Sequence, residues 1–466
     1  MNQAGQPFGL RAFRRLTCGS ASLTFAVGLA VLVCGCESAS KAPSASERTP
    51  QASTSAAALD SSAQPGHSTH PSASSAALAA LPNGIKQPDA TTSPSIALEN
   101  FSAQVEQLER LVKAEPDKLM FLTSAVSAYL DKVTYFGQMS ALGRAIELAE
   151  QATKLNPKDA KAFLLRSSVR GAIHDFKGAL ADLDTAAKFG AEDFDVAPKR
   201  AVVAMALGRY DDAEPVFAAE VKRFPNLSTL ALHAVCLGHM GKTAASEADF
   251  LAAEATYRDV SPFAISWLYF NRAEMWDRAG DPDRARALYG IAVERLPIFA
   301  RATIHLSELL PPARGKPLVE KVLPTSDDPE VSSALFLIND ALAPGSGSEH
   351  LARASKGYDE LMAKYPLAFS DHAAEFHLHA TKDPKKATEA AKINIDNRKT
   401  AESYELYLEA LVASGDAKGA CKLADDAGTF PYATTALRVQ RIAAYRACGK
   451  PELAAKIATG LPEPKP

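Results

Sequence analysis

Three histidines near the C-terminal end come closest to a chemical site by residue type and spacing. His372, His377 and His379 lie in the stretch 371–380, whose composition is typical of a helix. Imidazole rings bind metals and exchange protons near neutral pH, so the cluster could support a metal site or acid–base catalysis. Spacings of five and two residues do not put three rings on one helical face. We therefore predict no metal site, and keep an enzyme with a non-standard or metal site near His372 to His379 as the alternative function.

The cysteines offer a second kind of chemistry. After residue 36 the sequence contains Cys236, Cys421 and Cys448, and an odd number cannot pair completely. Cys421 and Cys448 fall near the ends of predicted helices that follow one another, so a disulfide between them is a candidate. Buried helical cysteines also serve as small apolar core residues, and the sequence leaves both interpretations open.

Sequence motifs of the common enzyme classes do not occur. The sequence contains no phosphate-binding glycine loop, zinc-type cysteine pairing, His-Glu-x-x-His motif or Gly-x-Ser-x-Gly elbow. We expect a protein that is not an enzyme and that needs no cofactor. The formal net charge is -3, which gives no basic field of the kind that nucleic-acid binding needs, so we expect no nucleic-acid partner.

The N-terminal segment has the layout of a secretory signal. Arginines between residues 11 and 15 precede an uncharged, largely apolar run over 16–36. Residues 33–36, Val-Cys-Gly-Cys, resemble the lipobox of bacterial lipoproteins, in which an aliphatic residue and two small residues precede the acylated cysteine. The resemblance implies that residues 1–35 are a signal peptide and that Cys36 carries the lipid. An uncleaved helical anchor is the alternative, since about 20 apolar residues can span a bilayer.

Residues 36–95 are predicted to be a disordered tether that begins at the lipidated cysteine. Ser, Ala, Thr and Pro dominate this segment, and few residues in it could build a core. About 60 flexible residues have a root-mean-square reach of roughly 45 Å. Glu37 stands where some bacteria use an aspartate to retain lipoproteins in the inner membrane. The lipoprotein resemblance therefore implies a protein anchored in the outer membrane and facing the periplasm.

From residue 96 onward a short helical pattern recurs. A turn, an aromatic residue and an alanine follow one another in 174–179 and again in 208–213, and the two alanines are 34 residues apart. In 213–225 and in 285–297 an aromatic residue and a proline follow the alanine at offsets of four and twelve. A fixed period of this length is typical of arrays in which each unit is a pair of helices.

These residues resemble the tetratricopeptide repeat (TPR), a 34-residue pair of antiparallel helices. The resemblance implies an all-α fold, an α-solenoid of stacked helix pairs. One amphipathic pair cannot bury its apolar face alone, so neighbouring pairs must share a continuous core. We predict a first array over 96–310, an irregular hinge over 311–350, where prolines and a Gly-Ser stretch interrupt the pattern, and a second array over 351–466.

In TPR proteins the first helices line a concave groove that takes peptides or helices. The best-matching repeat places Trp267, Phe270, Glu274, Asp277 and Arg278 at these positions, so the resemblance implies a groove for an apolar or basic segment of a partner protein. Packing of the two aromatic side chains against a neighbouring helix is the alternative. We expect an envelope-anchored scaffold that binds a partner polypeptide, for assembly of an envelope or secretion complex.

Overall fold

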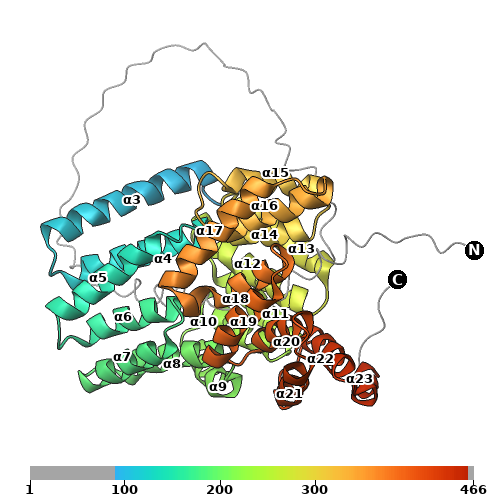
Figure 1. Ribbon diagram of the computed structural model, residues 1–466. Coiled ribbons are helices and arrows are strands. Elements are labelled where there is room, and N and C mark those ends of the chain that lie inside the picture. Colours follow the sequence, from blue (N-terminus) through green and yellow to red (C-terminus); the bar gives the residue numbers. More distant parts are fainter. Residues whose placement is uncertain (1–84, 86–89, 460–466) are drawn as a thin grey trace, which may run out of the picture.

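The computed structural model describes Ile85 and residues 90–459. The signal peptide predicted for 1–35, the lipidated Cys36 and nearly all of the predicted tether lie outside these described residues. Within the described part the chain is built from helices and contains no strand. Figure 1 shows the helices following one another as a stacked array that turns back on itself.

The first half of the array runs from α3 to α13. These helices are α3 (Pro94–Ala114), α4 (Leu119–Phe136), α5 (Ala141–Leu155), α6 (Ala160–Ala172), α7 (Phe176–Lys188), α8 (Asp193–Ala206), α9 (Tyr210–Arg223), α10 (Leu227–His239), α11 (Thr243–Thr256), α12 (Pro262–Arg278) and α13 (Pro282–Arg295). From α4 onward each even-numbered helix packs against the odd-numbered helix that follows it, and each pair packs against the next.

The second half continues the same pairing to α23. Its helices are α14 (Ala300–Glu308), α15 (Pro312–Val322), α16 (Pro329–Leu342), α17 (Ser348–Lys364), α18 (Pro366–His379), α19 (Pro384–Asn397), α20 (Ala401–Ala413), α21 (Ala417–Ala427), α22 (Thr435–Ala447) and α23 (Pro451–Ala458). The fold class expected from the repeat is therefore confirmed: the protein is an α-solenoid of stacked antiparallel helix pairs.

A recurrent tight turn joins the two helices of several pairs. A residue with positive φ ends the first helix, and an aspartate directly after it begins the second. The aspartate carboxylate accepts a hydrogen bond from the backbone N–H three residues further on, which satisfies one of the free donors at the helix start. The turns of this kind are His174-Asp175 before α7, Gly280-Asp281 before α13, Lys382-Asp383 before α19 and Gly415-Asp416 before α21.

The alanines that revealed the repeat lie where the helices of a pair meet. Ala179, Ala213 and Ala285 are each completely buried, as are Ala387 and Ala420 in the later pairs. Because a methyl group is the smallest side chain that still fills space, alanine at these positions lets the two helix backbones approach closely without leaving a cavity.

The irregular hinge expected for residues 311–350 is wrong, because α15 and α16 lie in this range. Pro312 and Pro329 occupy the first position of their helices, where the missing N–H would have no intrahelical partner in any case. These two prolines therefore mark helix starts. Only short loops, among them 343–347 before α17, remain irregular.

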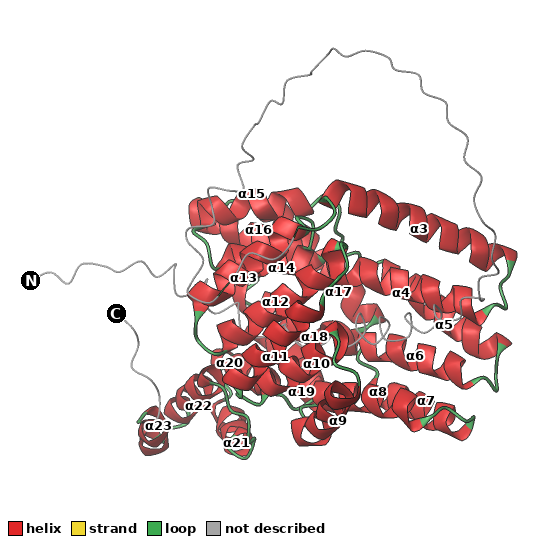
Figure 2. Cartoon of the chain, turned by 180° about the vertical axis from the view of Figure 1, so that it is seen from behind, coloured by secondary structure: helices red, strands yellow, loops and turns green. Residues whose placement is uncertain are grey.

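The array curves until its second half contacts the inner side of its first half. Ser326 Oγ, between α15 and α16, donates a hydrogen bond to the Gly137 carbonyl after α4 (2.9 Å). At Gly208, whose φ is +80°, a Cβ would lie only 2.0 Å from the Lys399 carbonyl oxygen, so the turn before α9 directly abuts the chain just before α20. Figures 1 and 2 show α17 to α20 lying beside the helices of the middle pairs in both views.

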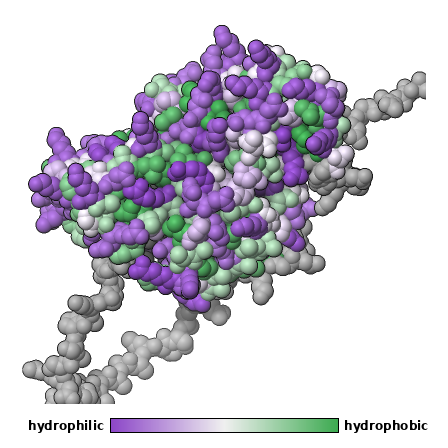
Figure 3. All heavy atoms as spheres, turned by 90° about the horizontal axis from the view of Figure 1, so that it is seen from below, coloured by the Kyte–Doolittle hydropathy of each residue, from purple (hydrophilic) through white to green (hydrophobic). Residues whose placement is uncertain are grey.

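On the face shown in Figure 3, hydrophobic residues do not form one continuous patch. They form separate small groups between hydrophilic residues. Among the described residues, none of the helices combines the length and the apolar character needed to cross a bilayer.

Candidate functional site

The helix expected to line an open groove, α12, is largely enclosed. Twelve residues of α12 are buried, against six of its partner α13. Trp267 and Phe270 are each 3% exposed, and the Phe270 ring lies 5.2 Å from that of Phe299 in the next pair. The expectation of an open groove on α12 is therefore wrong. The curvature of the array places other helices over this surface, so the aromatic side chains pack in the core.

The polar members of the expected groove instead face a closed, charged interior. Glu274 is 3% exposed, and burial raises its pKa to about 7 despite the nearby charges of Arg301 and Arg278. Burial likewise raises the pKa of Asp277 to about 6. Glu274 Oε1 and Arg278 Nε have no hydrogen-bond partner among the described residues. The interior therefore holds ionisable groups that the chain itself satisfies only in part.

Two buried histidine–glutamate pairs lie in this interior, one between two helices and one within a single helix. His239 of α10 lies 3.6 Å from Glu402 of α20, which joins the first half of the array to the second. Within α14, His305 Nδ1 lies 3.5 Å from a Glu308 carboxylate oxygen. Burial lowers the pKa of His305, but the Glu308 carboxylate outweighs this effect and raises the pKa to about 9. His305 is therefore a cation at neutral pH.

The three-histidine cluster of the sequence is not brought together. His372 Nδ1 lies 3.6 Å from Glu330 of α16, whereas His377 Nδ1 is 3.1 Å from Thr381 Oγ1 and His379 Nε2 is 3.9 Å from Glu409 of α20. Among the described residues, no group of three or more His, Cys, Asp or Glu side chains could hold a metal ion. His372 and His379 lie beside carboxylates of other helices, whereas His377 contacts a residue just after its own helix, so this geometry does not support the alternative of a site shared by the three.

A small cavity of about 30 Å³ lies beside His372 in the interior. Carboxylates from three successive even-numbered helices line it: Glu308 from α14, Glu330 from α16 and Glu375 from α18. Burial and the neighbouring acidic groups raise the pKa of Glu375 well above its ordinary value. Nothing in the sequence directly indicated this site, because its three carboxylates are spread over 68 residues and each repeat contributes only one.

The structure joins Cys421 and Cys448 in a disulfide, with a Cα–Cα distance of 5.9 Å. The bond connects α21 to the end of α22 and so links the last two pairs. Cys236, the remaining cysteine of the described part, is a buried free thiol, and burial raises its pKa to about 12. A thiol that stays protonated has little reactivity, so Cys236 acts as a small core residue.

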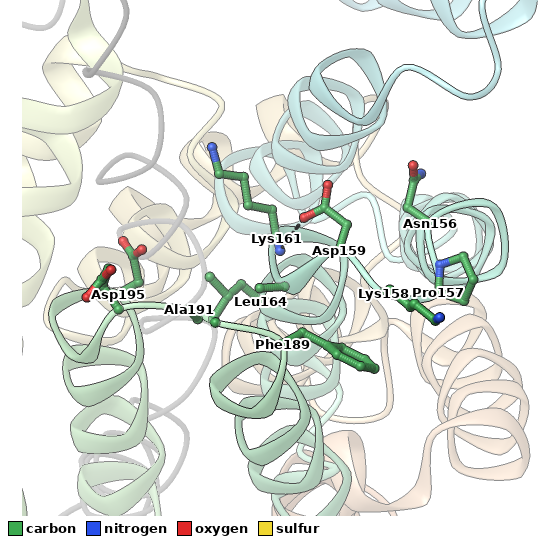
Figure 4. Close-up of a pocket in the computed structure, with 12 residues that line it drawn as sticks. Asn156, Pro157, Lys158, Asp159, Lys161, Leu164, Phe189, Ala191 and Asp195 are labelled. Atoms are coloured by element: carbon green, nitrogen blue, oxygen red, sulfur yellow. Dashed lines mark hydrogen bonds between the residues drawn. The ribbon is translucent and has the colours of Figure 1, made fainter.

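A large open depression lies on an edge of the solenoid. It has a volume of about 770 Å³ and is lined by residues 156–161, Leu164, residues 189–192 and Asp195. Figure 4 shows that Lys161 and Asp159 come from the start of α6, whereas Phe189 comes from the end of α7 and Asp195 from α8. The Asp159 carboxylate caps α6 by accepting a hydrogen bond from the Lys161 N–H (2.9 Å). We call this depression the edge groove.

Large apolar side chains are exposed at the helix ends around the edge groove. Phe189 is 37% exposed, Phe194 44%, Phe224 52% and Leu155 46%. The Arg223 guanidinium lies over two of these rings, 5.2 Å from the centroid of Phe194 and 4.8 Å from that of Phe224. We call Leu155, Phe189, Phe194 and Phe224 the aromatic edge. Exposed apolar residues that gather beside a depression are typical of surfaces that bind other proteins.

Three residues of the aromatic edge follow the period of the repeat in the sequence. Leu155, Phe189 and Phe224 stand at the end of the second helix of three successive pairs and are 34 and 35 residues apart. In α12–α13 the equivalent residue, Leu296, is completely buried. The periodic position is therefore visible in the sequence, but its exposure depends on what the folded array places over it.

Comparison with known proteins gives similarities in fold. No protein-family model and no curated protein matches this chain. Among solved structures, the human IFIT1 dimer with PPP-AAAA is 12% identical over 76% of this chain and 93% of that chain, with a TM-score of 0.39. Yeast Tom70 is 14% identical over 78% and 97%, with a TM-score of 0.31. YrrB, a TPR protein with an unusual peptide-binding site, is 15% identical over 41% and 94%, with a TM-score of 0.24.

Proposed function

We propose that this chain is a non-catalytic scaffold of the bacterial envelope, tethered to the outer membrane by a lipid at Cys36, that binds a partner polypeptide at the edge groove. The observation that carries the binding part is the combination of an open depression with exposed aromatic rings on one edge of a rigid array. The concave surface of the middle pairs is occupied by the chain itself, whereas the edge groove is open to a partner.

The chemistry of the edge groove suits an extended segment with a large apolar side chain. Phe189 and Leu164 supply an apolar floor, and the Phe163 ring stands 5.5 Å from that of Phe189. Apolar side chains of a partner can bury the exposed ring surface, at about 25 cal/mol for each Å² removed from water. The apolar contacts would therefore supply affinity.

Charges of opposite sign flank this floor. Lys158 and Lys161 stand on the side of α6, and Glu192 and Asp195 stand at the start of α8. A segment with an acidic residue on one side of its apolar anchor and a basic residue on the other would match both groups. The charges would therefore set the direction in which the segment lies.

The envelope part of the proposal is supported by the N-terminal sequence. An arginine-containing start, an apolar run and the Val-Cys-Gly-Cys pattern precede the predicted tether. On the other side of the tether, the Thr92 N–H donates a hydrogen bond to the Val260 carbonyl (2.7 Å), which fixes where the chain enters the folded part, at the loop before α12. A lipid and a tether at this end would leave the edge groove accessible.

Site-specific crosslinking in the native cell tests the binding surface. A photoreactive residue at position 189 is expected to give one discrete adduct, because Phe189 lies in the edge groove. The same residue at Leu251, which is 44% exposed on α11, is the matched control and should not give that adduct. Lys161→Glu should reduce the adduct at position 189 several-fold, since it reverses a charge of the groove. Equal adducts at both positions, or an adduct unaffected by Lys161→Glu, would contradict the proposed surface.

Fractionation of the envelope tests the anchor. Cys36→Ser should move the protein from the membrane fraction to the soluble periplasmic fraction, because acyl chains contribute about 0.8 kcal/mol for each buried CH₂. Cys34→Ser is the matched control and should leave the protein in the membrane fraction. A Cys36→Ser protein that stays with the membrane would show that an uncleaved helix or another contact holds it there.

A further inference from the structure

The small interior cavity is lined by three carboxyl groups, of which two have a histidine partner. Its three carboxylates belong to Glu308, Glu330 and Glu375. Glu308 is paired with His305 at 3.5 Å, and Glu330 with His372 at 3.6 Å. Glu375 has no hydrogen-bond or ion-pair partner among the described residues, so one carboxyl group of the cavity lining is unpartnered.

Two hydroxyl groups beside Glu375 are also unpartnered. Tyr358 of α17 is 3% exposed and Ser333 of α16 is 8% exposed, and both line the cavity. In the part of the chain that the structure describes, neither hydroxyl donates or accepts a hydrogen bond. Three hydrogen-bonding side chains from three helices therefore border one space without a partner.

We propose that this cavity binds a primary ammonium group. An ammonium nitrogen carries three N–H donors, which match the Glu375 carboxylate and the Tyr358 and Ser333 hydroxyl oxygens. The positive charge would balance Glu375. The cavity of about 30 Å³ holds one or two water-sized groups, so it accepts an ammonium head and excludes a bulky cation. The rings of Tyr358 and Phe376, whose centroids are 4.8 Å apart, supply the walls and favour an organic cation.

Binding of the cation and ionisation of Glu375 are linked. The acidic groups that face Glu375 are Asp371 on its own helix, Glu330 and Glu308 on the lining helices and Glu409 on α20. The basic groups beside the cavity are His305 and His372, which are held by Glu308 and Glu330. Burial and the neighbouring acidic groups raise the pKa of Glu375, whereas a bound ammonium ion would lower it, so binding should be coupled to proton release.

Calorimetry on the full chain tests the site with methylammonium as the probe. Wild-type protein should bind methylammonium saturably and release up to one proton per site, measured in two buffers of different ionisation enthalpy. Glu375→Gln should weaken binding by about tenfold or more and abolish the proton release, and Tyr358→Phe should weaken binding several-fold. Glu360→Gln, on the exposed side of α17, is the matched control and should bind like wild type. Thermal melting of each variant shows that it is folded.

A second ligand distinguishes two sources of the ammonium group, a lysine side chain of a partner and a small free amine. Tighter binding of Nα-acetyl-lysine amide than of methylammonium would support the site and assign it to a lysine side chain of a partner. Binding of methylammonium alone would support the site and assign it to a small free amine. Tetramethylammonium has no N–H donor and should bind at least about tenfold more weakly. Absence of saturable methylammonium binding to wild-type protein, or equal binding to Glu375→Gln, would overturn the proposal without affecting the edge groove.

Discussion

Trp267→Ala is expected to lower the free energy of unfolding by about 3–5 kcal/mol, because it removes the largest side chain of a buried helix and leaves a cavity that the rigid array cannot close. The sequence alone suggests a different result, loss of partner binding without loss of stability, because it places Trp267 in an open groove. The structure assigns the residue to the core. Denaturant unfolding followed by circular dichroism measures the change.

Phe224→Ala is the matched control for this prediction. Phe224 is 52% exposed and belongs to the aromatic edge, so its replacement should change stability by no more than about 0.5 kcal/mol. The crosslink at Phe189 should survive in Trp267→Ala below its melting temperature and should weaken in Phe224→Ala. If Trp267→Ala left the stability unchanged and abolished partner binding, the result would support an open groove on α12.

Arg398→Ala is expected to destabilise the protein by about 3–5 kcal/mol. Arg398 is 4% exposed and donates a hydrogen bond to Asp371 (2.5 Å) and another to Asn394 Oδ1 (2.8 Å). Removing the guanidinium leaves the Asp371 carboxylate buried without its main partner, which is far more unfavourable than losing an exposed pair. The pair joins α18 to the loop before α20, beside His174 of the first half, so its loss should loosen the closed array.

Two comparisons separate the buried pair from general effects of losing a charge. Lys392→Ala breaks the exposed pair with Asp396 and should leave stability nearly unchanged, because solvent screens exposed charges. The double variant Asp371→Asn, Arg398→Met should recover much of the loss, because it removes both buried charges. If Arg398→Ala and Lys392→Ala were equally stable, the pair would not be buried as the structure has it.

The Asp371–Arg398 pair also predicts that the stability of the protein depends on pH. Burial raises the pKa of Asp371, but the charges of His372 and Arg398 outweigh burial and hold the pKa below its ordinary value. The folded-state pKa is thus lower than that of the unfolded chain, which is about 3.9. The stabilisation is present above this value and is lost as the pH falls through the folded-state pKa. Denaturant unfolding between about pH 2 and 5 should show this loss in wild type and a smaller loss in Arg398→Ala, where His372 still favours the carboxylate.

Local sequence patterns determined the helix pairs from which this protein is built. Alanines 34 residues apart identified the contact between the helices of a pair, since only a small side chain fits where two backbones approach. Aspartates after a residue with positive φ began the second helices, because their carboxylates satisfy free backbone donors. The two cysteines at the last pairs were recognised as candidates for a disulfide. The proline at 312 was misjudged, because a proline that starts a helix and one that interrupts it look alike without the neighbouring helix ends.

The tertiary structure alone decided which surfaces are open. Curvature of a solenoid is the sum of small rotations between successive pairs, and no single repeat encodes it. In this protein the sum brings α20 against α10, so that His239 meets Glu402, Trp267 becomes a core residue and the groove on α12 closes. The same curvature gathers Glu308, Glu330 and Glu375 around one cavity and leaves Phe189 exposed. Local spacing fixes helices and pairs, whereas burial depends on contacts between residues far apart in the chain.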